Sequence, residues 1–98
     1  MLGIDITKIS RFNKPTKAFI KKILHPKEIL KYENEEDKSL FLASRWAIKE
    51  SLYKANNKYF HFNKINIEKK DNKYVFEEFQ ISTSKEEDYY IAVVTKGK

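Results

Sequence analysis

The 98-residue sequence contains no cysteine and only two glycines and two prolines. The absence of cysteine excludes disulfide bonds, thiolate metal sites and a cysteine nucleophile. Because the two glycines lie at positions 3 and 97, a glycine-rich phosphate-binding loop is also excluded. No apolar run approaches the length that spans a membrane, and no signal-peptide pattern follows Met1. We therefore expect a cytoplasmic protein without a membrane segment.

Aromatic residues are plentiful, with seven phenylalanines, six tyrosines and one tryptophan, so the chain is predicted to fold rather than to stay disordered. Its length corresponds to a single domain, residues 1–98. A domain of this size buries only a little over ~60% of the surface of its unfolded chain. Oligomerisation would therefore stabilise it.

Basic residues are concentrated in the first third of the chain. Between Lys8 and Tyr32, eight basic side chains and one acidic side chain leave a net charge of +7, which exceeds the +6 of the whole protein. This segment is either a solvated lysine-rich surface or a docking face for a polyanion, such as nucleic acid, an anionic membrane or an acidic protein. The charge alone does not choose between these alternatives.

The N-terminal half combines one strand with helices. Alternation predicts a strand over residues 1–6, with Leu2, Ile4 and Ile6 on one face and Asp5 on the other. Pro15 and Pro26 each suit a first helical position, which predicts the two short helices 15–24 and 26–32. The inward positions of these helices are predicted to be Ala18, Phe19, Ile20, Ile23, Leu24, Ile29 and Leu30. A longer central helix should cover 36–55 and stop at Asn56 and Asn57.

The C-terminal part is a predicted β-region. Asp71 and Asn72 form a hairpin signal, and strands are expected over 74–79, 80–84 and 89–95. The fold class is therefore α+β, with an antiparallel sheet packed on the long central helix and short N-terminal helices beside it.

The central helix contains the stretch Phe41–Ala55, FLASRWAIKESLYKA, which is apolar on nearly every side. Such a helix is normally buried between two layers. We expect it to pack on its own sheet on one side and on something else on the other. Glu50 lies within one apolar face, where a carboxylate is costly unless a cation or metal meets it. A surface salt bridge to Lys54, four residues later, is the simpler alternative.

Asp5 and Glu50 suggest a metal site. Asp5 could also cap the turn that follows its strand. Two carboxylates from a strand and a buried helix suit Mg²⁺, which fills its other positions with water and phosphate oxygens. Gly3, two residues before Asp5, would let a large ligand approach the backbone. Three cations of the central helix are placed for phosphates, as in a phosphoryl-transfer site: Arg45, Lys49 and Lys54.

Two segments resemble the signatures of the small bacterial holo-acyl-carrier-protein synthases, members of the 4′-phosphopantetheinyl transferase superfamily. The first is GIDITKISRF, residues 3–12, and the second is the W-x-x-K-E-x-x-x-K pattern of residues 46–54. A weaker third match is Ile81–Ser84, before the last strand. The two motifs in this order and at this separation form a strong signature, and the resemblance covers nearly the whole chain.

The resemblance implies transfer of the phosphopantetheine arm of coenzyme A to a serine of apo acyl carrier protein, with release of adenosine 3′,5′-bisphosphate. It implies that Asp5 and Glu50 hold Mg²⁺, that Glu50 helps to deprotonate the serine, and that Lys54 neutralises charge on the phosphates. Further contacts to coenzyme A are implied for Arg45, Lys49, Ser84 and Lys85.

The family's small members are homotrimers with sites between protomers, which agrees with the two-sided apolar helix. Carrier protein is acidic, so the basic N-terminal third should dock it by electrostatic steering. The residues that we select for this role are Arg11, Lys17, Lys21 and Lys22.

The sequence departs from the family pattern at two places. Lys85 stands where the family usually has a histidine, and Asn56 and Asn57 stand where it usually has glycines. The second interpretation is a small basic nucleic-acid-binding module, which would leave Asp5 and Glu50 without a task. The two departures from the family pattern leave a third interpretation open, a catalytically inactive family member that acts as an interaction protein.

Overall fold

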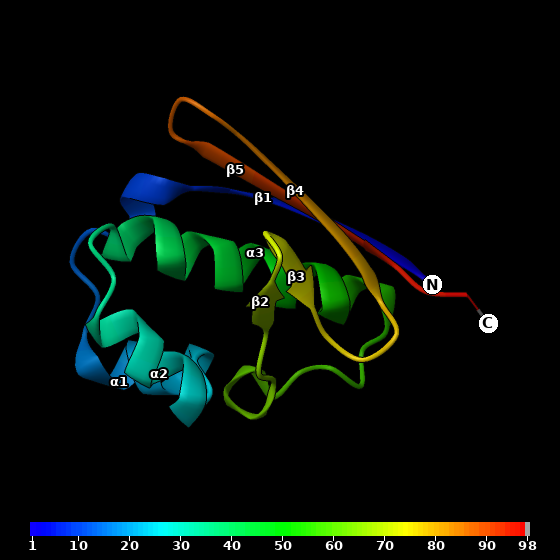
Figure 1. Ribbon diagram of the computed structural model, residues 1–98, viewed down its shortest axis with the longest axis horizontal. Helices are drawn as coiled ribbons and strands as arrows, with labels where there is room; N and C mark the ends of the chain where they lie inside the picture. The colour runs from blue at the N-terminus through cyan, green and yellow to red at the C-terminus, as the bar shows by residue number, and fades with distance from the viewer. Residues whose placement is uncertain (98) are drawn as a thin grey trace.

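The computed structural model describes residues 1–97 and has one long helix between two layers (Figure 1). The elements are β1 (Leu2–Lys8), η1 (Ile9–Phe12), α1 (Lys17–Ile23), α2 (Pro26–Glu33), α3 (Lys38–Ala55), η2 (Phe62–Lys64), β2 (Glu68–Lys70), β3 (Lys73–Val75), β4 (Gln80–Glu86) and β5 (Tyr89–Thr95). The predicted α+β class is confirmed. No helix within residues 1–97 is both long and apolar enough to cross a membrane.

The main sheet has the order β1-β5-β4, and both strand pairs are antiparallel. Because the first and last strands pair, the two ends of the chain lie side by side (Figure 1). Asp5 on β1 is opposite Ala92 on β5. β2 and β3 form a separate hairpin, whose turn residues Asp71 and Asn72 have φ values of 50° and 64°, as a tight hairpin turn requires.

Gly3 allows β1 to lie directly on α3. A Cβ atom at this position would be 1.8 Å from the carbonyl oxygen of Ser51 and 2.9 Å from the backbone nitrogen of Ala55. The space beside Gly3 is therefore filled by the chain's own helix, and the expectation that it admits a ligand is wrong. The glycine instead brings Asp5 close to the second half of α3.

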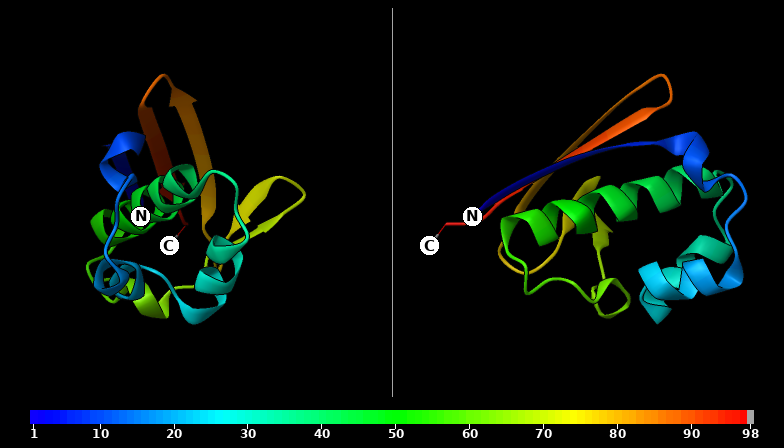
Figure 2. Two further views of the ribbon diagram at one scale, coloured as in Figure 1. Left: turned by 90° about the vertical axis from the view of Figure 1, so that its left-hand side faces the viewer. Right: turned by 180° about the vertical axis from the view of Figure 1, so that it is seen from behind.

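The side of α3 away from the sheet is covered by α1, α2 and η2 (Figure 2). Trp46 contacts three aromatic rings there, those of Phe12, Phe19 and Phe62, at centroid distances of 6.0, 5.9 and 5.8 Å. The predicted burial between two layers is thus correct. Both layers belong to the same chain, so the shape of this helix does not require a neighbouring protomer.

The uncovered apolar surface is the outer face of the main sheet, which we define by Leu2, Ile4, Ile6, Tyr89 and Ile91. Ile4 is 59% exposed and Ile6 58% exposed, whereas Gly3 and Thr7 on the opposite face of β1 are buried against α3. The aliphatic face of the predicted first strand is therefore directed away from the helix. Within residues 1–97, no element packs over it (Figure 2).

Three local expectations need correction. Ala18 and Leu30 are exposed, because α1 and α2 are each covered on one side only. Pro15 precedes α1, since the hydroxyl oxygen of Thr16 accepts a hydrogen bond from the Phe19 N–H and makes Thr16 the cap. The strand expected over 74–79 ends at Val75, where a turn begins and returns the chain to β4.

Candidate active site

Asp5, Glu50 and Lys54 meet where β1 crosses α3. The ammonium nitrogen of Lys54 lies 3.0 Å from Oδ1 of Asp5, so Lys54 pairs with the strand rather than with Glu50 one helical turn away. The side chain of Asp5 is 12% exposed and that of Lys54 is 51% exposed. The ion pair therefore has one end in the protein and the other in solvent.

The surroundings of Asp5 and Glu50 favour the binding of a cation. Partial burial raises the pKa of Glu50, the negative charge of Asp5 raises it further, and Lys54 and Arg11 act in the opposite direction. Oδ2 of Asp5 is buried and has no hydrogen-bond partner within residues 1–97. A buried carboxylate oxygen without a donor is costly and fits a site that is completed by a cation.

The donor set suits a hard cation with few protein ligands. No group of three or more His, Cys, Asp or Glu side chains within residues 1–97 could hold a metal ion. Asp5 and Glu50 could thus supply two carboxylate ligands and leave the remaining positions to water and phosphate oxygens, the arrangement Mg²⁺ often adopts with phosphate substrates.

A mainly aromatic hollow of about 390 Å³ opens beside Glu50. It is lined by Phe19, Lys22, Ile23, Trp46, Glu50, Tyr53, Phe60 and Phe62. At its edge the guanidinium carbon of Arg11 lies 4.7 Å from the centroid of the Trp46 ring, within range of a cation–π contact. A group bound in this hollow would contact both an apolar wall and the Glu50 carboxylate.

The four basic residues selected for carrier docking are all exposed: Lys17, Lys21 and Lys22 on α1, and Arg11 on η1. Lys22 lines the hollow itself. Arg11 lies over Trp46, another of its lining residues. The structure thus brings Lys22 and Arg11 to the hollow beside Glu50.

Lys49 has a structural position, and the prediction that it contacts a phosphate of coenzyme A is wrong for this structure. Its side chain is fully buried, and its ammonium group donates to Glu28 and to the carbonyl oxygens of Ile23 (2.7 Å) and Phe62 (3.0 Å). These three bonds use every donor of the group. Burial lowers the pKa of Lys49 to about 8, against the opposing effect of Glu28.

Glu28 is the buried partner that the sequence analysis missed. In the sequence Glu28 is the one acidic residue among the basic residues of the segment 8–32, but its side chain is fully buried. Its Oε1 accepts from the His25 N–H at 2.9 Å, and its Oε2 accepts from the Ile67 N–H at 3.1 Å. The spacing from His25 to Glu28 matches a capping box, so the sequence could have indicated the hydrogen bond to the His25 N–H.

We expect Lys49→Met to destabilise the protein by about 3–5 kcal/mol, because it removes the closer cation of the buried Glu28 carboxylate and leaves only the Arg45 guanidinium, 3.6 Å away. Lys54→Met is the matched control and should cost no more than about 1 kcal/mol, because its ion pair is half exposed. Urea unfolding followed by circular dichroism measures both. Equal losses in the two variants would contradict the assignment of Lys49 as a structural residue.

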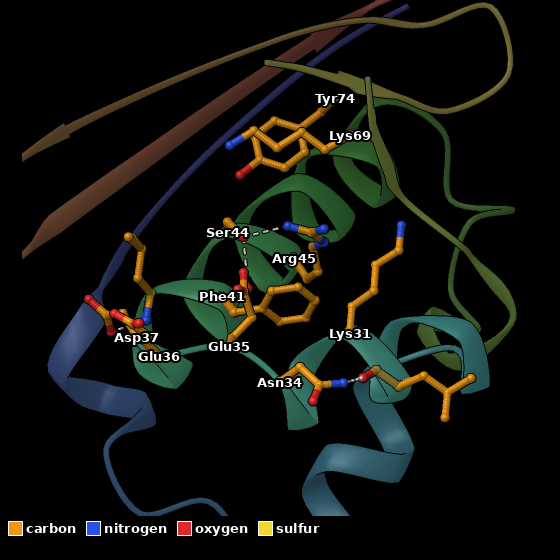
Figure 3. A pocket seen from close by; sticks show the side chains of 12 residues that line it. Lys31, Asn34, Glu35, Glu36, Asp37, Phe41, Ser44, Arg45, Lys69 and Tyr74 are labelled. Carbon is orange, nitrogen blue, oxygen red and sulfur yellow. Dashed lines mark hydrogen bonds between the residues drawn. The ribbon is translucent and has the colours of Figure 1, made fainter. Parts of the chain in front are cut away.

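Arg45 faces a different hollow, of about 850 Å³, between α2, α3 and β3 (Figure 3). Its side chain is 4% exposed, and Nη1 donates to Oγ of Ser44 at 3.1 Å. Lys31 and Lys69 line the same hollow. Three acidic side chains lie on its rim: Glu35, Glu36 and Asp37. The phosphate contact predicted for Arg45 stays a prediction, and it would be made here rather than in the hollow beside Glu50.

Ser84 lies on the opposite face of the sheet from Asp5 of the same chain. Ser84 is opposite Ile91, which is in turn opposite Ile6, so Ser84 shares the outer face of the sheet. Ser84 and Lys85 line a shallow hollow together with these two isoleucines. Because Asp5 faces α3, Ser84 could reach a ligand at the carboxylates only in a second copy of the chain.

Comparison with known proteins agrees with this geometry. The family model described as 4′-phosphopantetheinyl transferase superfamily matches residues 1–94. The holo-[acyl-carrier-protein] synthase of Mycoplasma mobile is 54% identical over 96 residues, which cover 98% of this chain and 88% of the relative. The fold and the sequence thus define a transferase, and the chain belongs to the 4′-phosphopantetheinyl transferase superfamily.

Solved structures support the same assignment. The holo-[acyl-carrier-protein] synthase of Neisseria meningitidis aligns with a TM-score of 0.80 and 25% identity, over 95% of this chain and 94% of that one. The Bacillus anthracis enzyme, solved in complex with CoA (3′,5′-ADP), aligns with a TM-score of 0.79 and 26% identity, over 95% and 91%. The predicted resemblance to holo-acyl-carrier-protein synthases is confirmed.

Proposed function

We propose that this protein transfers the 4′-phosphopantetheine group of coenzyme A to a serine of apo acyl carrier protein, with Mg²⁺ held by Asp5 and Glu50. The observation that carries the proposal is the buried Oδ2 of Asp5, which lies beside Glu50 at the crossing of the two family motifs and has no hydrogen-bond partner among residues 1–97. We infer the carrier substrate from the names of the relatives, and coenzyme A from the ligand of the Bacillus anthracis complex.

In the reaction, the serine oxygen attacks the phosphorus that carries the pantetheine arm, and the bond from this phosphorus to the oxygen of adenosine 3′,5′-bisphosphate breaks. Glu50 accepts the proton of the serine hydroxyl. Asp5 and Glu50 would hold Mg²⁺, which would supply positive charge to neutralise the phosphates of coenzyme A. Lys54 stabilises the same developing charge and is oriented by its bond to Asp5.

The test is a mass-spectrometric transfer assay with apo acyl carrier protein, coenzyme A and Mg²⁺, with EDTA as the control. The carrier should gain the mass of phosphopantetheine, and EDTA should prevent the gain. No gain with several carriers would contradict the proposal and favour an inactive family member. The same assay also decides whether Lys85 and Asn56–Asn57 are compatible with activity.

The basic face of α1 is proposed to bind the acidic carrier. We expect Lys21→Glu combined with Lys22→Glu to raise the KM for the carrier at least about tenfold and to change the KM for coenzyme A much less, because both lysines are exposed and Lys22 lines the hollow beside Glu50. Lys70→Glu combined with Lys73→Glu is the control, since it makes the same charge change on the β2–β3 hairpin. Steady-state kinetics at two salt concentrations measure both pairs. Equal effects of the two pairs would remove α1 from the docking face.

The proposed assembly is a homotrimer. The outer face of the sheet supports it, because this face is apolar and exposed and also carries Ser84. In such an assembly Ser84 and Lys85 of one protomer would contact coenzyme A bound at the carboxylates of a neighbour. The proposal includes the cytoplasmic location that the sequence predicts.

A further inference from the structure

Asp88 connects the β4–β5 turn to η1 through three hydrogen bonds. The Ile9 N–H donates to the carbonyl oxygen of Asp88 at 2.8 Å, and the Ser10 N–H donates to its Oδ1 at 3.0 Å. The Ser10 hydroxyl donates to Oδ2. Both carboxylate oxygens of Asp88 are therefore directed at a residue 78 positions earlier in the chain.

Ser10 directly precedes Arg11, whose guanidinium group lies over Trp46 beside Glu50. η1 is only one turn long, and a helix so short has few hydrogen bonds of its own to fix its orientation. The bonds from Asp88 supply this constraint from outside the helix. Because Arg11 is exposed, its position over Trp46 depends on the backbone that carries it.

We propose that Asp88 is a positioning residue for carrier docking, which holds η1 so that Arg11 stays over Trp46 at the edge of the Glu50 hollow. This inference rests on the proposed function, in which Arg11 contacts the acidic carrier. Asp88 itself touches neither substrate. Its carboxylate acts through Ser10 on Arg11.

The direction of the change in the KM for the carrier distinguishes a positioning role of Asp88 from a purely electrostatic one. Removal of a negative charge near an acidic carrier should lower the KM for the carrier if long-range electrostatics alone mattered. Loss of the hydrogen bonds should raise it. We expect Asp88→Ala to raise the KM for the carrier about five- to tenfold, since charge-assisted hydrogen bonds are lost. Ser10→Ala removes one of these bonds, is less disruptive to folding, and should raise it about threefold.

Two further variants serve as controls. Asp88→Asn keeps an oxygen for the Ser10 N–H and a polar partner for the hydroxyl, so its KM should stay within about twofold of wild type. Glu87→Asn removes one negative charge from the same turn, at a residue with φ of 53° that asparagine tolerates, and should not raise the KM.

Fluorescence tests the inference without any transfer activity, because Trp46 is the only tryptophan. We expect Asp88→Ala and Arg11→Ala to raise the acrylamide quenching constant of Trp46 by the same amount, since either change uncovers the indole. The double variant should show no further increase in quenching or in KM. Glu87→Asn should match wild type.

Unchanged quenching in Asp88→Ala would overturn the inference, and so would effects of Asp88→Ala and Arg11→Ala that add fully in the double variant. If the wild-type protein fails to modify any carrier, the proposed function fails, while the quenching data still decide whether Asp88 positions Arg11.

Discussion

Replacement of Glu50 by glutamine should abolish transfer and at the same time stabilise the metal-free protein. Glutamine keeps the size of the side chain but neither binds a divalent cation as a carboxylate does nor accepts a proton from the serine. Activity should fall by about a thousandfold or more. Asp5→Asn should cause a comparable loss through the other metal ligand.

The gain in stability follows from the raised pKa of Glu50. Burial and the nearby Asp5 raise this pKa in the folded state. The folded protein therefore holds more protons than the unfolded chain between the ordinary pKa of a glutamate and the raised value. The contribution of Glu50 to the free energy of unfolding should therefore fall as the pH rises through this window, and the deficit persists above it. Glu50→Gln lacks this dependence and should be more stable than wild type at neutral pH.

Mg²⁺ should make the wild type more stable than Glu50→Gln, the reverse of the order expected without the metal. A ligand that binds only the folded state at a hundred times its dissociation constant stabilises by about 2.7 kcal/mol. Wild type should gain stability on addition of Mg²⁺, and Glu50→Gln should gain much less. Denaturant unfolding between pH 4 and pH 8, with Mg²⁺ or with EDTA, measures both effects. Glu78→Gln, at an exposed position, is the control for loss of a carboxylate.

Either of two results would contradict the assignment of the metal ligands. One is full transfer activity in Glu50→Gln. The other is equal stabilisation of Glu50→Gln and wild type by Mg²⁺.

Replacement of Ile4 by lysine should dissociate the protein into folded monomers without activity. Ile4 is 59% exposed on the outer face of the sheet, so the protomer itself tolerates a charge there. In a trimer that buries this face, each copy would place an unpaired charge in an apolar interface at a cost of several kcal/mol. Because Ser84 and Lys85 would then no longer reach a neighbour's carboxylates, activity should be lost with the assembly.

Analytical ultracentrifugation at micromolar concentration distinguishes trimer from monomer, and circular dichroism checks the fold. Leu30→Lys is the matched control for the assembly, because Leu30 is 65% exposed but lies on α2, away from the sheet. Sedimentation of wild type as a monomer, or of Ile4→Lys as a trimer, would contradict an interface on this face.

The sequence by itself determined the α+β class, the long helix that carries Glu50 and the selection of Asp5 and Glu50 as a pair. These features depend on local spacing. Helical periodicity, strand periodicity and the two family motifs each lie within a short continuous segment of the chain. The sequence also indicated that α3 is buried on two sides. It could not indicate that both covering layers belong to the same chain.

Only the tertiary structure decided the partners of the charged side chains and which face of the first strand is exposed. Lys49 and Glu28 are 21 residues apart, Asp5 and Lys54 are 49 apart, and Ser10 and Asp88 are 78 apart. No periodicity encodes such pairings, since they depend on how layers pack. The same packing places Gly3 against α3, turns Ile4 and Ile6 outward, and makes Lys49 a buried structural residue while Lys54 stays at the site.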